Sequence, residues 1–289
     1  MLRIVLRTLF VVILIALGAS ARPATARSPL PAWRRQGQVV WTRTPDGRVK
    51  ARAYSSDHIT VRPVLVVWLH GDLGPGSEPY ELTQQMSDLT DNVVAAAILR
   101  PGYDDAEGDH SAGRKGLAIG DNYTAQVTDD VHAVIRHLQT RYRPRAVIVM
   151  GHSGGAGVAA NLLGRYPEDA DAAVLVACSC DPRGFMERWK LKNPGVPRNQ
   201  PNPSLSPLDM AAGVSRKTLV RMVVGSNDTV VLVQPSQAYA AALKRNGVDV
   251  RLAVVNGADH VSVLGTGEVR QAVAEVIAAE GGKVRAPGR

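Results

Sequence analysis

Short apolar runs alternate along the chain with longer segments in which apolar residues recur at helical spacing. Runs rich in Val, Ile, Leu and Ala predict strands buried on both faces. They lie at residues 61–69, 93–99, 146–150, 172–177, 219–225 and 250–255. The segments with helical spacing predict helices. These lie at about 80–89, 123–142, directly after 153, 236–245 and 268–279.

Two further strands open this pattern. Residues 38–44 and 48–54 are joined by Pro45-Asp46-Gly47, which predicts an antiparallel hairpin. Because the later strands alternate with helices, we expect an α/β fold with a mostly parallel central sheet and helices on both faces. Ligands bind such sheets at the carboxyl ends of the strands.

One segment breaks the alternation. Residues 182–215 contain six prolines and few periodic positions, so we expect a small irregular excursion after the sixth strand. The excursion carries Arg183, Arg188, Lys190, Lys192 and Arg198. This charge is compatible with an anionic substrate, but a solvated loop is the favoured interpretation.

The N-terminal residues have the pattern of an export signal. Arg3 and Arg7 precede an unbroken apolar run at Leu9–Leu17. Ala24-Thr25-Ala26 is a small-residue cleavage site, with Ala19-Ser20-Ala21 as a second candidate. The run is too short for a comfortable membrane span, so we expect a cleaved signal peptide and no stable membrane anchor. The expected organisation is a signal peptide at 1–26, a linker at 27–37, one α/β domain at 38–281 and a basic tail at 282–289.

Charge adds little to the picture. The formal net charge of +8 falls to +5 if the chain is cleaved after residue 26. No aromatic-plus-basic pattern is present, so we expect no nucleic-acid partner.

An acidic loop at 104–110 offers oxygen ligands for a cation, yet its spacing matches no known cage, and a solvated loop without metal is favoured. Cys178 and Cys180, the two cysteines, either form a disulfide or remain as two small thiols.

The strongest chemical signal is Gly151-His152-Ser153-Gly154-Gly155, a G-x-S-x-G motif between a predicted strand and a predicted helix. A strand that turns into a helix within a few residues passes through a sharp bend, and Ser153 lies at its apex. The motif alone also arises by coincidence in a glycine-rich chain. Its flanking elements and two later residues make a nucleophile the better interpretation.

A serine nucleophile needs a base, and the base needs a carboxylate that fixes its tautomer. Asp228 follows the strand at 219–225, although an aspartate there also suits a turn cap. His260 follows the strand at 250–255 and precedes the last helix. The other histidines have simpler interpretations: His70 is structural, and His152 points away from its neighbour Ser153.

The chain order Ser153, Asp228, His260 is that of α/β-hydrolases. From about Val39 to Ala279, the sequence resembles this family, and within it dienelactone-hydrolase-like and prolyl-oligopeptidase-like members. The segments responsible are VVWLHGD, GHSGGA, SPLD, VVGSNDTVV and GADH. The resemblance implies an oxyanion hole formed by the backbone N–H groups of Gly154 and Asp72.

These observations predict an exported serine hydrolase that cleaves carboxylic esters of small molecules through an acyl-enzyme on Ser153, without a cofactor. A small serine peptidase or amidase, and a non-catalytic binding protein on the same fold, are the alternatives. Aromatic residues near the strand ends are candidates for substrate contacts. They are Tyr80, Tyr103, Tyr123, Phe185 and Trp189. The pattern specifies neither the acyl and alcohol groups nor the oligomeric state.

Overall fold

A computed structural model describes residues 37–74, 78–88, 90–116, 119–193 and 202–284. The predicted signal peptide at 1–26, nearly all of the predicted linker and the last part of the predicted tail lie outside these residues. Among the described residues, no helix combines the length and the apolar character needed to cross a bilayer.

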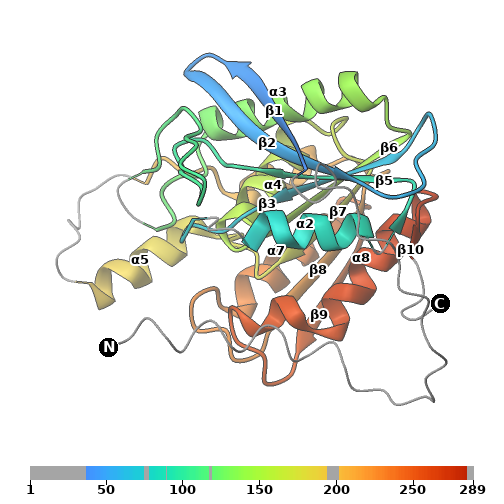
Figure 1. The fold of residues 1–289 in the computed structure, drawn as a ribbon. Coiled ribbons are helices and arrows are strands. Elements are labelled where there is room, and N and C mark those ends of the chain that lie inside the picture. The colour runs from blue at the N-terminus through green and yellow to red at the C-terminus, as the bar shows by residue number, and fades with distance from the viewer. Residues whose placement is uncertain (1–36, 75–77, 89, 117–118, 194–201, 285–289) are drawn as a thin grey trace, which may run out of the picture. The chain divides into compact units, whose positions relative to one another are not determined.

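An eight-stranded sheet forms the centre of the described structure, in the order β1-β2-β5-β3-β6-β7-β8-β9 (Figure 1). Its strands are β1 (Gln38–Thr44), β2 (Gly47–Ser55), β3 (Val64–Leu69), β5 (Val93–Ile98), β6 (Ala146–His152), β7 (Ala172–Val176), β8 (Leu219–Gly225) and β9 (Asp249–Val255). The opening hairpin is antiparallel, β2 runs antiparallel to β5, and all later pairings are parallel. This sheet confirms the predicted fold class.

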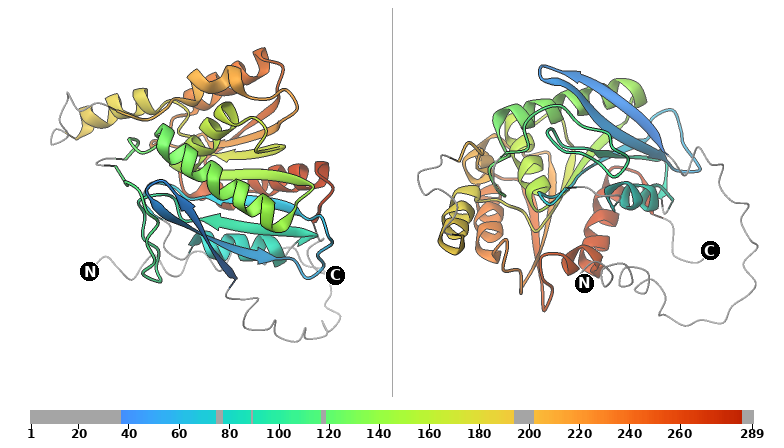
Figure 2. Two further views of the ribbon diagram at one scale, coloured as in Figure 1. Left: turned by 90° about the horizontal axis from the view of Figure 1, so that it is seen from above. Right: turned by 60° about the vertical axis from the view of Figure 1, so that its left-hand side comes forward.

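Helices cover both faces of the sheet, as the two views in Figure 2 show. They are α2 (Glu78–Asp88), α3 (Ala125–Tyr142), α4 (Gly154–Arg165), α5 (Pro182–Lys192), α6 (Pro207–Met210), α7 (Val233–Arg245) and α8 (Gly267–Ala279), with 3-10 turns η2 (Ala211–Gly213) and η3 (Ser262–Gly265). Helices α3, α4 and α7 pack on one core, and α2 and α8 on the other.

Strand β3 explains why the central strands are nearly continuous apolar runs. All six of its residues are buried. Leu65, Val67 and Leu69 belong to the core beneath α3 and α4, whereas Val64 and its alternating neighbours belong to the core beneath α2 and α8. Since successive side chains of a strand point to opposite faces, a strand covered on both faces needs apolar residues at every position.

The structure differs from the expected organisation at two places. The segment after β7 opens with the 11-residue helix α5 rather than with irregular chain. Asp181 caps this helix by accepting a hydrogen bond from the Gly184 N–H, and Pro182 occupies the first turn, where its missing N–H costs nothing. In addition, β10 (Lys283–Val284) pairs with β4 (Thr90–Asp91), so regular structure extends beyond the predicted domain end at 281.

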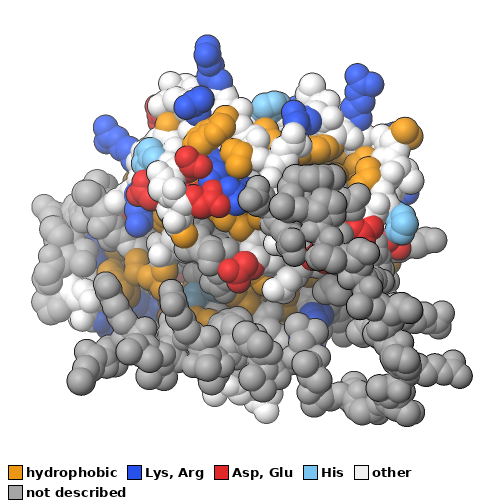
Figure 3. Space-filling model, in the orientation of Figure 1, with side chains coloured by type: hydrophobic (Ala, Val, Ile, Leu, Met, Phe, Trp, Pro, Cys, Tyr) orange, Lys and Arg blue, Asp and Glu red, His pale blue; other side chains and the backbone are white. Residues whose placement is uncertain are grey.

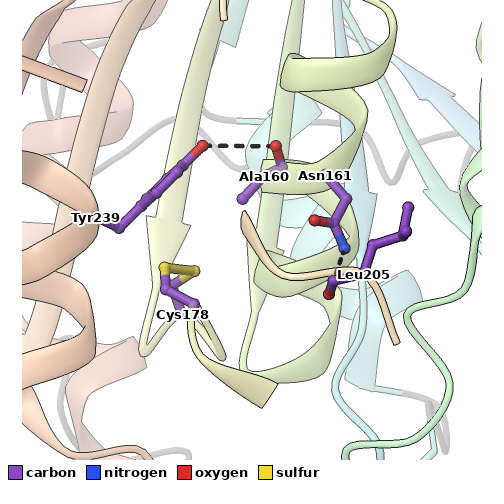
Figure 4. The surroundings of a disulfide bond; sticks show 6 residues. Ala160, Asn161, Cys178, Leu205 and Tyr239 are labelled. Atoms are coloured by element: carbon purple, nitrogen blue, oxygen red, sulfur yellow. Dashed lines mark hydrogen bonds between the residues drawn. A yellow bond between two sulfur atoms is a disulfide. The ribbon is translucent and has the colours of Figure 1, made fainter. Parts of the chain in front are cut away.

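The structure joins the two cysteines, a question that the sequence left open. A disulfide links Cys178 to Cys180 in the segment directly after β7, and both residues are fully buried. Figure 4 shows the bridge beside Tyr239 of α7, whose hydroxyl donates to the Ala160 carbonyl of α4. The disulfide therefore lies in the core beneath the start of the excursion.

Charged groups of both signs are interspersed on the face shown in Figure 3. Lys and Arg side chains lie singly among hydrophobic and acidic ones there, and this face carries no continuous basic stripe among the described residues. The expectation of no nucleic-acid partner remains a prediction.

Two glycines allow β6 and α4 to approach β3 at the bend. A Cβ on Gly151 would overlap the backbone of Gly155, and a Cβ on Gly155 would overlap the carbonyls of Leu69 and His70. Because these contacts are with backbone atoms, no side-chain movement relieves them. The glycine positions are therefore set by steric constraint.

We expect Gly155→Ala to lower the free energy of unfolding by about 3 kcal/mol, because an added methyl group forces backbone atoms apart. Gly267→Ala is the matched control, since a Cβ there meets only the far end of Arg270 at 3.9 Å. Urea unfolding measures both variants. Equal stabilities for the two would contradict this account of the bend.

Candidate active site

Ser153 lies at a strained turn between β6 and α4. Its backbone has φ 55° and ψ −119°, a conformation that side-chain-bearing residues rarely adopt. Hydrogen bonds hold the turn from both sides. The Ser153 N–H donates to the Val176 carbonyl at 2.9 Å, and the Ser153 carbonyl accepts from the N–H groups of Gly157 and Ser179 at 3.1 and 3.2 Å. The surrounding structure thus fixes the position of the Ser153 side chain.

The structure brings the three predicted triad residues together. The distance between Ser153 Oγ and His260 Nε2 is 2.9 Å, and that between His260 Nδ1 and Asp228 Oδ2 is 2.8 Å. The Asp228 side chain is fully buried, and that of His260 is 15% exposed. With Nδ1–H donating to the carboxylate, Nε2 accepts from the serine hydroxyl. This tautomer is the one that a general base requires.

Asp228 also performs the structural role that the sequence suggested as an alternative. Its second carboxylate oxygen accepts hydrogen bonds from the N–H groups of Val230 and Val231 at 2.9 and 2.8 Å. One oxygen caps the turn, and the other faces His260. The two interpretations of Asp228 are therefore compatible, because the turn bonds fix the orientation of the carboxylate.

The loops that carry Asp228 and His260 are tied to each other. Strands β8 and β9 are parallel neighbours, and both loops begin at the same edge of the sheet. The Ser226 N–H donates to the Val255 carbonyl, and the Asn227 N–H donates to the Ala258 carbonyl, each at 2.9 Å. Pairing between the strands thus continues into the loops and sets the acid beside the base.

His152 contacts the loop of His260 and was not predicted to do so. Its Nε2 lies 2.9 Å from the His260 carbonyl oxygen, and the two ring centroids are 4.9 Å apart. Burial, with a smaller contribution from the charge of His260, lowers the pKa of His152 to about 4. The neutral ring donates its Nε2–H to the carbonyl. The ring of His152 thus packs against the backbone that carries the base, and its expected orientation away from Ser153 stays a prediction.

The predicted oxyanion hole lies where β3 and β6 end side by side. A Cβ on Gly71 would be 3.4 Å from Ser153 Cβ, so the loop after β3 passes close to the serine. Within the described part of the chain, the backbone N–H groups of Asp72 and Gly154 have no hydrogen-bond partner. The role of these two N–H groups as an oxyanion hole stays a prediction.

The Asp72 side chain points into the protein. Its Oδ1 accepts from Arg100 Nη1 at 2.9 Å, and its Oδ2 accepts from the Tyr123 hydroxyl at 2.6 Å and the Gly120 N–H at 3.0 Å. These bonds anchor the loop that carries the Asp72 N–H. His70, interpreted as structural, is fully buried, and its Nε2 accepts from the Arg100 N–H.

Three of the tyrosines expected to contact substrate are buried instead. Tyr80 donates to Asp105 at 2.7 Å, Tyr123 donates to Asp72, and Tyr103 packs edge-on against His70 at 4.8 Å. A tyrosine near a loop buries its ring when its hydroxyl finds an internal partner. The three residues support the site loops from within rather than line an open surface.

The aromatic residues of α5 are placed differently. Phe185 is buried and approaches Gly120, and Trp189 stacks on Phe185 with centroids 6.0 Å apart. Trp189 is partly exposed. Among the four tyrosine and tryptophan candidates, it alone keeps an accessible ring, and its substrate contact remains a prediction.

The acidic loop is bound by a lysine. Lys50 Nζ of β2 lies 2.5 Å from Asp105, 3.1 Å from Glu107 and 2.5 Å from Asp109. Burial of the ammonium opposes its charge, but hydrogen bonds to these carboxylates raise the Lys50 pKa overall. The carboxylates could ligate a metal by their spacing, yet the ammonium group lies among them. The expectation of a simple solvated loop was wrong for Asp105, which is buried.

Beyond the geometry of the site, the sequence itself matches a known protein family. The model of the prolyl oligopeptidase family matches residues 105–279, more than half of the chain. The chain belongs to the prolyl oligopeptidase family. It is therefore a serine hydrolase of the α/β-hydrolase fold, the family to which the sequence motifs pointed. No curated protein sequence matches the chain.

Solved structures share the fold of this prolyl oligopeptidase family member at low sequence identity. An esterase from Pyrococcus furiosus is 17% identical with a TM-score of 0.65, over 84% of this chain and 90% of that chain. A candidate dienelactone hydrolase from Klebsiella pneumoniae is 15% identical with a TM-score of 0.60, over 84% and 98%. An acylaminoacyl peptidase from Pyrococcus horikoshii is 14% identical with a TM-score of 0.61, over 87% and 42%.

The lowered pKa of His152 predicts a pH dependence of stability. Between about pH 6.5 and 4 the unfolded chain binds a proton at this residue and the folded chain does not, so stability falls as the pH falls. One such histidine contributes up to about 1.4 kcal/mol per pH unit. We expect His152→Gln to reduce the slope of unfolding free energy against pH by this amount.

Denaturant unfolding between pH 4.5 and 7 measures this slope. His58→Gln replaces an exposed histidine and is expected to keep the wild-type slope. A wild-type slope in His152→Gln would contradict the assignment of a buried neutral ring.

Proposed function

We propose that this serine hydrolase cleaves carboxylic esters of small molecules, with Ser153 as nucleophile, His260 as general base and Asp228 as the orienting carboxylate. The observation that carries the proposal is the hydrogen-bonded chain from Ser153 Oγ through His260 to Asp228 at a strained strand-to-helix turn. A binding protein on the same fold has no need to place a strained hydroxyl on the acceptor nitrogen of a histidine.

The mechanism follows from these distances. Ser153 Oγ attacks the ester carbonyl carbon while His260 Nε2 takes the hydroxyl proton. The carbonyl oxygen becomes negatively charged and accepts hydrogen bonds from the N–H groups of Gly154 and Asp72, each worth about 3 kcal/mol in the transition state. His260 then protonates the departing alcohol, which leaves the acyl group on Ser153. A water molecule, deprotonated by His260, releases the acid.

Esters are the easier substrates for this mechanism because of leaving-group chemistry. An alcohol departs readily once the tetrahedral intermediate has formed, whereas an amine must be protonated in the same step. The chain also aligns with 90% of the Pyrococcus furiosus esterase and with 42% of the acylaminoacyl peptidase. Family membership and the second of these structures keep a peptidase or amidase as the alternative.

Export remains part of the proposal. It is supported by the positive start, apolar run and small-residue site within residues 1–26. The disulfide between Cys178 and Cys180 supports it independently, because such bonds persist in oxidising compartments. The enzyme would act in the periplasm or outside the cell.

We expect wild-type protein to react with a serine-directed fluorophosphonate and Ser153→Ala to be unlabelled, with kcat for a short-chain ester reduced by about 10⁴-fold or more. Asp228→Asn should lower kcat by about 10³- to 10⁴-fold, because the wrong histidine tautomer is then favoured. Ser215→Ala is the control. Ser215 precedes the first residue of β8, whereas Asp228 follows the last residue of that strand. Failure of the wild type to label or hydrolyse any ester would remove the main support for an enzyme.

A matched pair of substrates separates the esterase hypothesis from the peptidase or amidase hypothesis. We expect kcat/KM for a p-nitrophenyl ester to exceed that for the p-nitroanilide of the same acyl group by about 100-fold or more, because p-nitrophenolate can leave as a stabilised anion, whereas p-nitroaniline must be protonated as it leaves. Initial rates on active-site-titrated enzyme provide the comparison. Comparable values for the two substrates would favour the peptidase reading.

A further inference from the structure

A negative charge lies beside the predicted oxyanion hole. Asp72 supplies one of the two proposed N–H donors, and its carboxylate lies against the residue that supplies the other: a Cβ added to Gly154 would overlap Asp72 Oδ1. In the transition state of the proposed ester cleavage, the substrate oxygen between these two donors would carry a second negative charge. Like charges a few ångströms apart in a protein interior repel strongly. An uncompensated Asp72 carboxylate would therefore oppose the proposed reaction.

Arg100 lies two residues after the end of β5, and its guanidinium group binds this carboxylate. Its Nη1 lies 2.9 Å from Asp72 Oδ1, the same oxygen that approaches Gly154, and 3.0 Å from the His70 carbonyl. The guanidinium carbon lies 5.1 Å from the ring centroid of Tyr103 and 5.8 Å from that of Tyr123. The Arg100 side chain is fully buried, so water does not screen it.

The other partners of Asp72 are uncharged. Tyr123 and the Gly120 N–H bind Oδ2, and neither brings a formal charge. Within the described residues, Arg100 is the only cation in an ion pair with Asp72. Nε and Nη2 of Arg100 are buried and lack hydrogen-bond partners among the described residues. A buried arginine with two unpaired nitrogen atoms is costly, so packing alone does not account for this residue.

We propose that Arg100 is a positioning residue that neutralises Asp72, so that a carboxylate-bearing loop can supply an oxyanion donor without repelling the oxyanion. The proposal rests on the function proposed above. Arg100 acts through Asp72 and does not touch the substrate.

This role predicts an asymmetry between two variants that break the same ion pair. Arg100→Met leaves an unpaired carboxylate near the oxyanion, and we expect kcat to fall about 100-fold with KM changed less than about 3-fold. Asp72→Asn leaves an unpaired cation, which does not repel the oxyanion, and we expect kcat to fall less than about 5-fold. A purely structural ion pair would cost the same activity in either direction.

The double variant Asp72→Asn/Arg100→Met tests the charge directly. Removing the carboxylate should restore kcat at least about 10-fold over Arg100→Met. Arg100→Lys keeps the charge and should stay within about 10-fold of wild type. Rates are measured on enzyme titrated for reactive Ser153, so that loss of folded protein does not count as loss of rate.

A boronic acid provides a second readout. Its boron accepts the Ser153 oxygen and becomes a negatively charged tetrahedral adduct while His260 takes the proton. We expect Arg100→Met to weaken inhibition by about 100-fold and Asp72→Asn to weaken it far less. If Arg100→Met does not fold, Arg100→Lys, Asp72→Asn and the double variant still give the comparison.

Equal losses in Arg100→Met and Asp72→Asn, or a double variant no better than Arg100→Met, would overturn the inference while wild-type hydrolysis left the proposed function intact. Where Arg100→Met is not folded, the inference would be overturned if kcat of the double variant were more than about 100-fold lower than kcat of Asp72→Asn. A wild type that neither hydrolyses esters nor binds the boronic acid would instead overturn the proposed function. The two failures are therefore distinguishable.

Discussion

The turn at Ser153 is the constraint on which the site depends. A strand and a helix meet within one residue there, and the serine backbone adopts φ 55° because no relaxed path joins them. The turn is tolerable only because Gly151 and Gly155 allow backbone atoms into contact and because Val176 and Ser179 bind the serine backbone. The strain is thus offset by neighbouring strands, and the hydroxyl is presented at the edge of the sheet.

The same sheet edge explains how residues far apart in sequence converge. Strand β6 presents the serine, β8 the acid, β9 the histidine and β3 the loop of Asp72. Each parallel strand ends at this edge, so a short loop after any of them reaches the same region. Hydrogen bonds between the loops after β8 and β9, and the contact of His152 with the His260 carbonyl, then align the acid with the base.

The sequence predicted the parts of the molecule that depend on local pattern. The apolar runs located the central strands, because strands buried on both faces admit few polar residues. The positions of Asp228 and His260 followed from where their strands end. The catalytic roles of these residues and of Ser153 stay predictions, whereas the short distances among them are a property of the structure.

The sequence could not predict features that depend on partners distant in sequence. Lys50 and the acidic loop are about 55 residues apart, and nothing local in either indicates the ion pairs. Tyr80, Tyr103 and Tyr123 stand near strand ends, as substrate contacts often do, but internal acceptors bury them. Arg100 reads as an ordinary polar residue at a strand end, and its link with Asp72 is visible only in the folded chain. The cap at Asp181, followed by Pro182 in the first turn, was the local signal that could have revealed α5.

The most direct test of the central claim is a crystal structure of the enzyme after reaction with a phosphonate. The account predicts a covalent bond from phosphorus to Ser153 Oγ, with the phosphonyl oxygen within hydrogen-bond distance of the N–H groups of Gly154 and Asp72, and His260 still bound to Asp228. A phosphonate on another residue, or a phosphonyl oxygen turned away from both N–H groups, would contradict it.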